Sequence, residues 1–296
     1  MFFKCKGSGG AVVTIDGVEV EDDLALSSGV SYEPTNVSTL PYSFYQGGAV
    51  VNNNEIHILG NGEASTAHYK LNGLTWSNVS TLPYNFNYGC AVVLESEIHI
   101  LGSYDNKNHY KYNGSSWTSV STLPYKFYNG NAVVLNNEIH ITDGNHGSTD
   151  YSYHYKYNGT SWTSVSTLPY QPSASCSAIV LNEEIHIMGS SVSPQTQHYK
   201  WNGSSWSKVS TLPYAFLNGS AVVFNNEIHI MGSSGSSSNY KKHYKYNGVS
   251  WTKLTDLPYN FYYGSTVVHN NKIHILGSYD TNNKMSHYEV AKEYLY

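Results

Sequence analysis

Short apolar segments alternate with polar turns along most of the chain. Gly48–Val51 is a continuous apolar run, which suits a strand that is buried on both faces. The polar turn 52–54 leads into Glu55–Leu59, where isoleucines and a histidine alternate with the two-residue period of a strand. A third segment, His68–Leu71, runs into Asn72-Gly73, the dipeptide most typical of a type I′ hairpin turn. The pattern therefore predicts short antiparallel strands joined by tight turns.

This unit returns along the chain at a spacing of 41 to 45 residues, measured between the prolines of a repeated Leu-Pro dipeptide. Those prolines are Pro41, Pro83, Pro124, Pro169, Pro213 and Pro258. The histidine of the second segment recurs as His57, His99, His140, His186, His229 and His274. The histidine that opens the third segment recurs as His68, His109, His154, His198, His243 and His287. A tryptophan marks a fourth segment at Trp76, Trp117, Trp162, Trp206 and Trp251. Four antiparallel strands at this period indicate the blade of a β-propeller.

The first three segments occur six times, whereas the tryptophan-bearing fourth segment occurs five times. The stretch 31–41, SYEPTNVSTLP, matches SSWTSVSTLP of the repeat, with Pro34 at the tryptophan position. We therefore expect this N-terminal strand to complete the sixth blade. The C-terminal residues 291–296 lack the Asn-Gly turn, and whether they compete for the same place stays open at this point.

The Asn-Gly hairpin, the tryptophan of the last strand and a glycine after the second strand resemble the kelch repeat. One glycine of the kelch doublet is kept at Gly60, Gly102, Gly189, Gly232 and Gly277. The resemblance covers about residues 31–290 and implies an all-β, six-bladed kelch-like propeller over residues 31–296.

Residues 1–30 lie outside the repeats. The sequence VVTIDGVEV, residues 12–20, predicts a short β-hairpin about Asp16-Gly17. An isolated hairpin is marginally stable in water, so this segment is expected to dock on the propeller, to pair with another copy of the chain, or to attach to a larger assembly such as a virion. It resembles the N-terminal adapters of phage tail proteins, and the Asn-, Tyr- and Lys-rich repeats resemble phage or prophage proteins of low-GC bacteria.

Six copies of one histidine favour a structural role, since a catalytic site needs a single copy. A pH-sensitive packing role and a metal site are the alternatives. A metal needs converging ligands, and separate blades keep these histidines apart. We therefore predict neither a metal site nor a cofactor.

The amino-acid composition limits the classes of partner that the protein is expected to bind. Charged residues make up 12% of the chain, all 16 basic residues are lysine, and the net charge is −5. Without arginine or a basic cluster, nucleic acid is not an expected partner. No segment approaches a membrane span, and the three cysteines do not suggest a disulfide framework. The start of the chain lacks the apolar run of a signal peptide, so the expected location is a virion or the cytoplasm.

Loops between blades and loops from second to third strands are expected on one face of the ring. The second set differs from blade to blade, as in a scaffold that carries a binding site. Tyrosine, aspartate and asparagine there suit a carbohydrate or a polar protein surface. The predicted ligand-binding residues are Tyr84, Tyr125, Tyr214 and Tyr259 between blades, and Tyr104, Asp105, Asp143, Tyr151, Tyr240, Tyr279 and Asp280 in the variable loops. The alternative is that the inter-blade aromatic residues only seal the gap between blades.

The fourth inter-blade loop, residues 170–177, departs from the others. Its sequence YQPSASCS lacks the usual phenylalanine, is one residue longer and contains Cys176. Either the blade is irregular at this point or the functional site lies here.

These observations predict a binding module without enzymatic activity, in a phage or prophage virion, that recognises a host-surface glycan or protein. The alternative is an intracellular protein–protein interaction scaffold. The copper ligands of kelch-type galactose oxidases cannot be assigned in this chain. Six-bladed kelch sugar epimerases and sialidase propellers act on acidic sugars, for which arginine would be expected.

Overall fold

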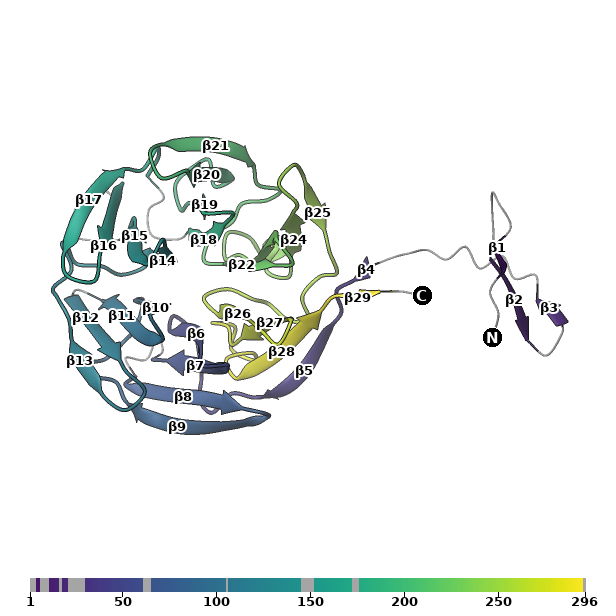
Figure 1. Cartoon of the computed structure of the whole chain (residues 1–296), viewed down its shortest axis with the longest axis horizontal. Helices are drawn as coiled ribbons and strands as arrows, with labels where there is room; N and C mark the ends of the chain where they lie inside the picture. The colour runs from purple at the N-terminus through teal and green to yellow at the C-terminus, as the bar shows by residue number, and fades with distance from the viewer. Residues whose placement is uncertain are drawn as a thin grey trace.

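A computed structural model describes residues 4–5, 11–15, 18–20, 30–60, 65–104, 106–144, 152–171 and 176–294. Figure 1 shows six four-stranded sheets arranged around a central axis. In five of them the strands follow the order of the chain, and in the sixth an N-terminal strand is the fourth. Every blade is antiparallel, with its first strand nearest the axis and its fourth strand at the rim. The predicted six-bladed propeller of four-stranded blades is therefore confirmed.

The strands of the blades have the following bounds. Blade 1 consists of β6 (Gly48–Asn52), β7 (Glu55–Leu59), β8 (Ala67–Asn72) and β9 (Thr75–Thr81). Blade 2 consists of β10 (Cys90–Leu94), β11 (Glu97–Ser103), β12 (Asn106–Tyr112) and β13 (Trp117–Ser119). Blade 3 consists of β14 (Asn131–Leu135), β15 (Glu138–Thr142), β16 (Tyr153–Tyr157) and β17 (Trp162–Thr167).

The second half of the ring follows the same plan. Blade 4 consists of β18 (Ser177–Leu181), β19 (Glu184–Met188), β20 (Gln197–Trp201) and β21 (Trp206–Thr211). Blade 5 consists of β22 (Ser220–Phe224), β23 (Glu227–Met231), β24 (His243–Tyr246) and β25 (Trp251–Lys253), with the 3₁₀ helix η1 (Ser237–Asn239) between β23 and β24. Blade 6 consists of β26 (Ser265–His269), β27 (Lys272–Leu276), β28 (Ser286–Ala291) and β5 (Pro34–Thr39).

The N-terminal strand closes the ring as predicted. β5 pairs with β28, and Pro34 lies opposite Val290. Trp76 lies opposite Leu71 in the same way in blade 1, so Pro34 takes the place of the tryptophan in this blade. The C-terminal strand β29 (Glu293–Tyr294) does not take this place, because it pairs with β4 (Val30–Ser31) in a separate two-stranded sheet.

Residues 1–30 contribute a separate three-stranded sheet of β1 (Lys4–Cys5), β2 (Ala11–Ile15) and β3 (Val18–Val20). The register Ile15 opposite Val18 is that of the expected hairpin, whose turn Asp16-Gly17 lies outside the described residues. The division into residues 1–30 and 31–296 as separate units stays a prediction.

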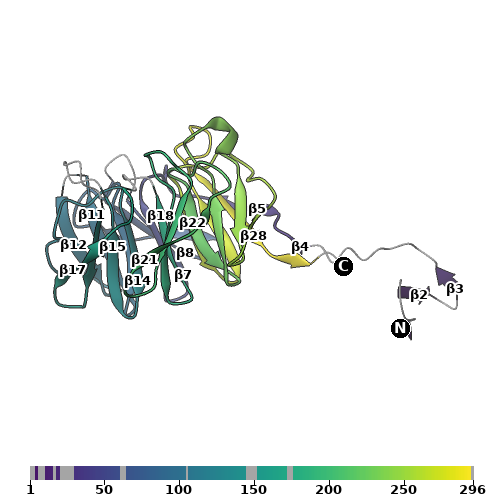
Figure 2. The ribbon, with the colours of Figure 1, turned by 90° about the horizontal axis from the view of Figure 1, so that it is seen from above.

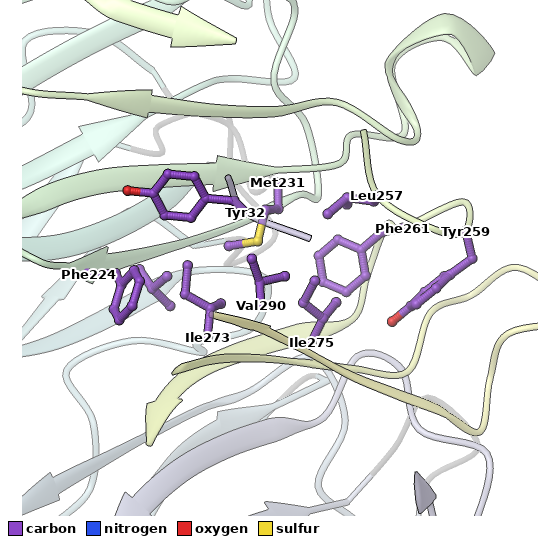
Figure 3. Close-up of a cluster of buried hydrophobic side chains, with 10 residues drawn as sticks. Tyr32, Phe224, Met231, Leu257, Tyr259, Phe261, Ile273, Ile275 and Val290 are labelled. Atoms are coloured by element: carbon purple, nitrogen blue, oxygen red, sulfur yellow. The ribbon is translucent and has the colours of Figure 1, made fainter. Parts of the chain in front are cut away.

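The core of the propeller lies between neighbouring blades. Between blades 1 and 2, for example, Leu59 packs with Phe86, Ile98 and Ile100, all fully buried. The junction between blades 5 and 6 lacks the tryptophan that lies in the other junctions, because Pro34 occupies its position on the fourth strand of blade 6. Figure 3 shows Tyr32 filling this junction beside Met231 and Phe224. Its ring lies 6.3 Å from that of His243, the counterpart of the 5.6 Å contact between Trp117 and His68.

The two histidine series form buried pairs within each blade. His57 Nδ1 lies 2.9 Å from His68 Nε2 on the adjacent strand, and His68 Nδ1 lies 2.8 Å from Ser80 Oγ. Ser80 Oγ also accepts a hydrogen bond of 3.0 Å from Nε1 of Trp117 in the next blade. Burial lowers the pKa of His57 to about 4 and of His68 to about 3, so both rings are neutral at pH 7. The structural interpretation of the repeated histidines therefore fits this geometry.

Turn type differs from the prediction. The left-handed pairs of a type I′ turn occur between first and second strands, as at Asn53 and Asn54 with φ of 48° and 61°. In the Asn-Gly hairpins only the glycine has positive φ, as at Gly114 with 95°. The reason is local, because Asn113 Oδ1 accepts the main-chain N–H groups of Ser115 and Ser116 and so stabilises a longer turn.

Candidate functional site

The two sets of loops share one face of the ring, as predicted. Tyr104 N–H donates to the carbonyl of Asn87 (3.2 Å), and Tyr279 N–H donates to the carbonyl of Tyr262 (2.9 Å). Each of these bonds joins a loop between second and third strands to an inter-blade loop. Figure 2 shows the ring from its side, with η1 rising from this face. We call it the loop face.

The four inter-blade tyrosines of the predicted set pack into the junctions between blades. Tyr125, Tyr214 and Tyr259 are each at most 8% exposed, and Tyr84 is half-buried. Each hydroxyl donates to a main-chain carbonyl at the end of a second strand: Tyr84 to Gly102, Tyr125 to Asp143, Tyr214 to Gly232 and Tyr259 to Gly277, over 2.7–3.2 Å. These four predicted ligand residues are therefore corrected to packing residues that seal the junctions between blades.

Four tyrosines of blades 5 and 6 do come together at the loop face. Tyr279 is 48% exposed, and its ring centroid lies 6.1 Å from that of Tyr262 and 6.0 Å from that of Tyr263. Tyr262 in turn lies 5.0 Å from Tyr240. We call Tyr240, Tyr262, Tyr263 and Tyr279 the tyrosine patch. Lys284 Nζ lies over the Tyr279 ring at 5.8 Å from its centroid, so a cation borders the patch.

Asp280 borders the same patch in a fixed orientation. Its carboxylate accepts hydrogen bonds from Asn260 Nδ2 (3.1 Å), Asn283 Nδ2 (2.6 Å) and the main-chain N–H of Asn282 (3.2 Å). Desolvation acts to raise the pKa of Asp280, but the bonds from Asn260 and Asn283 outweigh it and hold the pKa below its usual value. Asp280 is therefore ionised at neutral pH and presents acceptors beside the tyrosines.

Other predicted residues lie elsewhere. Tyr104 is 64% exposed in blade 2 and contacts Tyr128 at 5.1 Å between ring centroids, apart from the tyrosine patch. Asp105 and Tyr151 lie outside the described residues. The structure thus unites Tyr240, Tyr279 and Asp280 of the predicted set. It adds Tyr262 and Tyr263, whose Tyr-Tyr doublet occurs in one inter-blade loop of the chain.

At the axis, the loop face opens into the central channel, and one residue from each of five blades surrounds the opening. These residues, Gln46, Tyr88, Asn129, Asn218 and Tyr263, have left-handed φ between 50° and 59°. Main-chain bonds connect them from blade to blade: Gln46 N–H to Tyr263 O (2.7 Å), Tyr88 to Gln46 (2.8 Å), Asn129 to Tyr88 (2.6 Å) and Tyr263 to Asn218 (2.7 Å). Left-handed backbone is unusual for tyrosine, and such strain gathers at functional sites. We call this opening the channel mouth.

Blade 4 supplies Cys176 to the channel mouth, and behind it lies the fully buried Asp143. Cys176 Sγ donates to Asp143 Oδ2 at 2.7 Å, and Asn131 Nδ2 approaches both Cys176 Sγ (3.0 Å) and Asp143 Oδ1 (3.4 Å). Burial raises the pKa of Asp143 to about 7, and burial beside this carboxyl raises the pKa of the Cys176 thiol. Asp143 is therefore not the exposed loop residue that the sequence predicted.

Two departures from the repeat coincide around Asp143. Asp143 occupies the position of Gly60 and Gly102 in the preceding blades, where a Cβ atom would lie 1.9 Å from the carbonyl oxygen of the next inter-blade phenylalanine. The fourth inter-blade loop has Pro172 in place of that phenylalanine, and Pro172 lies outside the described residues. Both departures are visible in the sequence, but the contact of Asp143 with Cys176 requires the packing of neighbouring blades.

Within the described residues, no group of three or more His, Cys, Asp or Glu side chains could hold a metal ion. The described part of the chain also contains no helix that is long and apolar enough to cross a membrane.

No family model matches the chain, and no curated protein matches its sequence. Among solved structures, the chain is similar to that of YjhT, with a TM-score of 0.73 and 17% sequence identity. The match covers 86% of this chain and 99% of the YjhT chain. At this identity the similarity establishes the fold alone, a β-propeller, which commonly serves as a binding module.

The similarity to YjhT overturns the prediction that the chain is not an enzyme. That prediction relied on the absence of arginine and on copper ligands that could not be assigned, although the kelch resemblance itself includes six-bladed sugar epimerases. A shared propeller fold leaves room for catalysis, so the chain is not restricted to a non-enzymatic role.

Proposed function

We propose that the loop face binds a cell-surface glycan through the tyrosine patch, and that the chain serves as the glycan-binding module of a phage or prophage virion. The observation that carries the proposal is the contact of four tyrosines at the loop face, where Tyr279 is 48% exposed and Tyr240, Tyr262 and Tyr263 are half-buried.

The chemistry of the patch suits sugars. A phenol ring offers an apolar face to the C–H groups of a sugar and a hydroxyl to its polar edge. Asp280 adds fixed acceptors for sugar hydroxyls, because Asn260 and Asn283 hold its carboxylate. Rigid aromatic rings also lose little conformational entropy on binding, which favours affinity from a small surface.

The virion part of the proposal draws on the sequence. Residues 1–30 form strands outside the propeller, as an attachment segment would, and the repeats resemble those of phage and prophage proteins. In this arrangement the N-terminal segment joins the virion or another copy of the chain, and the loop face meets the host.

The proposal predicts that purified protein binds wall polysaccharide from low-GC Gram-positive cells. Replacing both Tyr262 and Tyr279 by alanine should weaken this binding at least tenfold, about 1.4 kcal/mol, because two stacking rings are lost. Isothermal titration calorimetry with extracted polysaccharide measures the effect. Tyr104→Ala is the matched control, since it removes an exposed tyrosine of the same face outside the patch.

Equal binding by the Tyr262→Ala/Tyr279→Ala variant and the unmodified protein would contradict the assignment to the patch. Binding to proteins of the cell extract, with none to any polysaccharide, would favour the interaction-scaffold alternative instead.

A further inference from the structure

We propose that the channel mouth holds the terminal unit of the glycan, and that this unit is a neutral sugar. The inference rests on the proposed function and adds to it the class of sugar and the direction in which the chain enters.

The groups at the channel mouth indicate a neutral ligand. Besides five glycines, the described residues that line it are two asparagines, Gln46, two tyrosines and Cys176, and none is charged. Asn218 Nδ2 also donates to Ser234 Oγ (2.8 Å), and the Cys176 thiol donates to Asp143. Because the belt of main-chain bonds already uses the N–H or C=O groups of these residues, ligand contacts fall to their side chains. Amides and hydroxyls both donate and accept, which matches the hydroxyl groups of a sugar.

Among the described residues, no cationic side chain lines the mouth to pair with an anionic sugar. A carboxylate or phosphate group is bound in proteins by arginine, lysine or converging main-chain N–H groups. None of the described residues lining the mouth is a lysine, and Asp143 lies directly behind Cys176. When Asp143 is ionised, its negative charge further disfavours an anion at this point.

The tyrosine patch and the channel mouth are continuous, because Tyr263 belongs to both. Its ring contacts Tyr262 and Tyr279 in the patch, and the same residue lines the mouth. A glycan lying along the patch therefore leads into the mouth with one end.

The channel below the mouth explains why that end is terminal. The inner strands line it with apolar side chains, including Val50, Val92, Val133, Ile179 and Val222. These side chains offer no hydrogen bonds to a second sugar, and burying hydroxyl groups against them is unfavourable. The glycan therefore ends at the ring of amides and phenols.

The test uses the full chain and single sugars. Glucose, galactose and N-acetylglucosamine at millimolar concentration are the neutral probes, and glucuronic acid and N-acetylneuraminic acid are the acidic probes, in isothermal titration calorimetry. We expect at least one neutral sugar to bind and to compete with the polysaccharide, and both acidic sugars to bind at least tenfold more weakly.

Variants place the binding at the mouth. The double variant Asn129→Gly and Asn218→Gly removes two amides while glycine keeps the left-handed backbone. It should weaken the binding of the neutral sugar at least tenfold. The matched control is Asn136→Gly and Asn225→Gly, which changes two exposed left-handed asparagines in turns on the opposite face.

The outcomes separate this inference from the proposed function. One outcome is polysaccharide binding that depends on Tyr262 and Tyr279 but shows no competition with single sugars and no response to the Asn129/Asn218 variant. That result would support the tyrosine patch and contradict the terminal-unit site. Equal or tighter binding of the acidic sugars overturns the neutral class. If neither polysaccharide nor single sugar binds, both proposals fall.

Discussion

A single residue, Asp143, shows how the repeat accommodates a departure. It adopts φ of 55° at a position that is glycine in neighbouring blades, and its carboxyl is enclosed by Cys176 and Asn131. Burying a carboxylate is unfavourable, so the folded protein favours the protonated form, and the pKa is about 7. Asp143 thus has a stability effect that depends on pH.

The sign of this effect follows from linkage. The carboxyl is ionised above about pH 4 in the unfolded chain but only above about pH 7 in the folded one. Its contribution to stability is therefore full below pH 4 and is lost as the pH rises to 7. Asp143→Asn removes this dependence, keeps the size of the side chain and tolerates left-handed backbone.

We expect the advantage of Asp143→Asn over the unmodified protein to grow by about 2–3 kcal/mol between pH 5 and pH 8. Urea unfolding at both pH values gives this difference, in which the contributions of all other titrating groups cancel. A pH-independent difference would contradict the raised pKa. Cys176→Ser at both pH values is the control, since a hydroxyl can also donate to Asp143.

At the scale of elements, hydrogen bonds between histidine, serine and tryptophan connect the third strand of one blade with the fourth strands of two blades. Four serines, Ser38, Ser80, Ser166 and Ser210, bind a histidine nitrogen and the indole N–H of the next blade. Each such hydroxyl satisfies two polar groups in an otherwise apolar junction.

Ser80→Ala should lower the free energy of unfolding by about 2 kcal/mol, because His68 Nδ1 and Trp117 Nε1 lose their shared partner. Thermal or urea unfolding at pH 7 measures the loss. Ser77→Ala is the matched control on the same strand, and its exposed side chain should make its replacement nearly neutral. A loss for Ser80→Ala no larger than that for Ser77→Ala would argue against the connection between blades.

The sequence predicts the elements better than it predicts their contacts. The spacing of the repeats and their apolar runs are enough to predict six blades. The match of residues 31–41 to the fourth strand of the repeat is enough to predict the closing strand. The burial of Tyr125 and the pairing of His57 with His68 depend on neighbouring strands and blades, which a linear pattern does not specify. The channel mouth shares a backbone conformation and not a residue type, so glutamine, tyrosine and asparagine there show no common motif.

At the scale of the whole molecule, the repeat places a pair of buried histidines in every blade. Twelve histidines, two in each blade, are buried, and burial lowers the pKa of each to about 4 or less. The unfolded chain binds protons on these groups near pH 6.5, whereas the folded protein does not. Their contribution is therefore complete above pH 6.5 and declines as the pH falls toward 4.

The propeller should therefore unfold steeply in mild acid. Each histidine lowers the stability by roughly 1 kcal/mol per pH unit below pH 5.5, and twelve together exceed the 5–15 kcal/mol that is typical of a folded domain within about one unit. We expect cooperative unfolding between pH 4 and pH 5.5, with uptake of about ten protons. Tryptophan fluorescence measures the unfolding, and the rise in pH of an unbuffered solution measures the proton uptake. Added sodium chloride should shift the midpoint little, because desolvation is the largest cause of these lowered pKa values and repulsion from neighbouring charges is a smaller one. A protein that stays folded at pH 3.5, or a midpoint that moves strongly with salt, would contradict this account, since it requires the buried imidazole pair within each blade to be neutral in the folded protein.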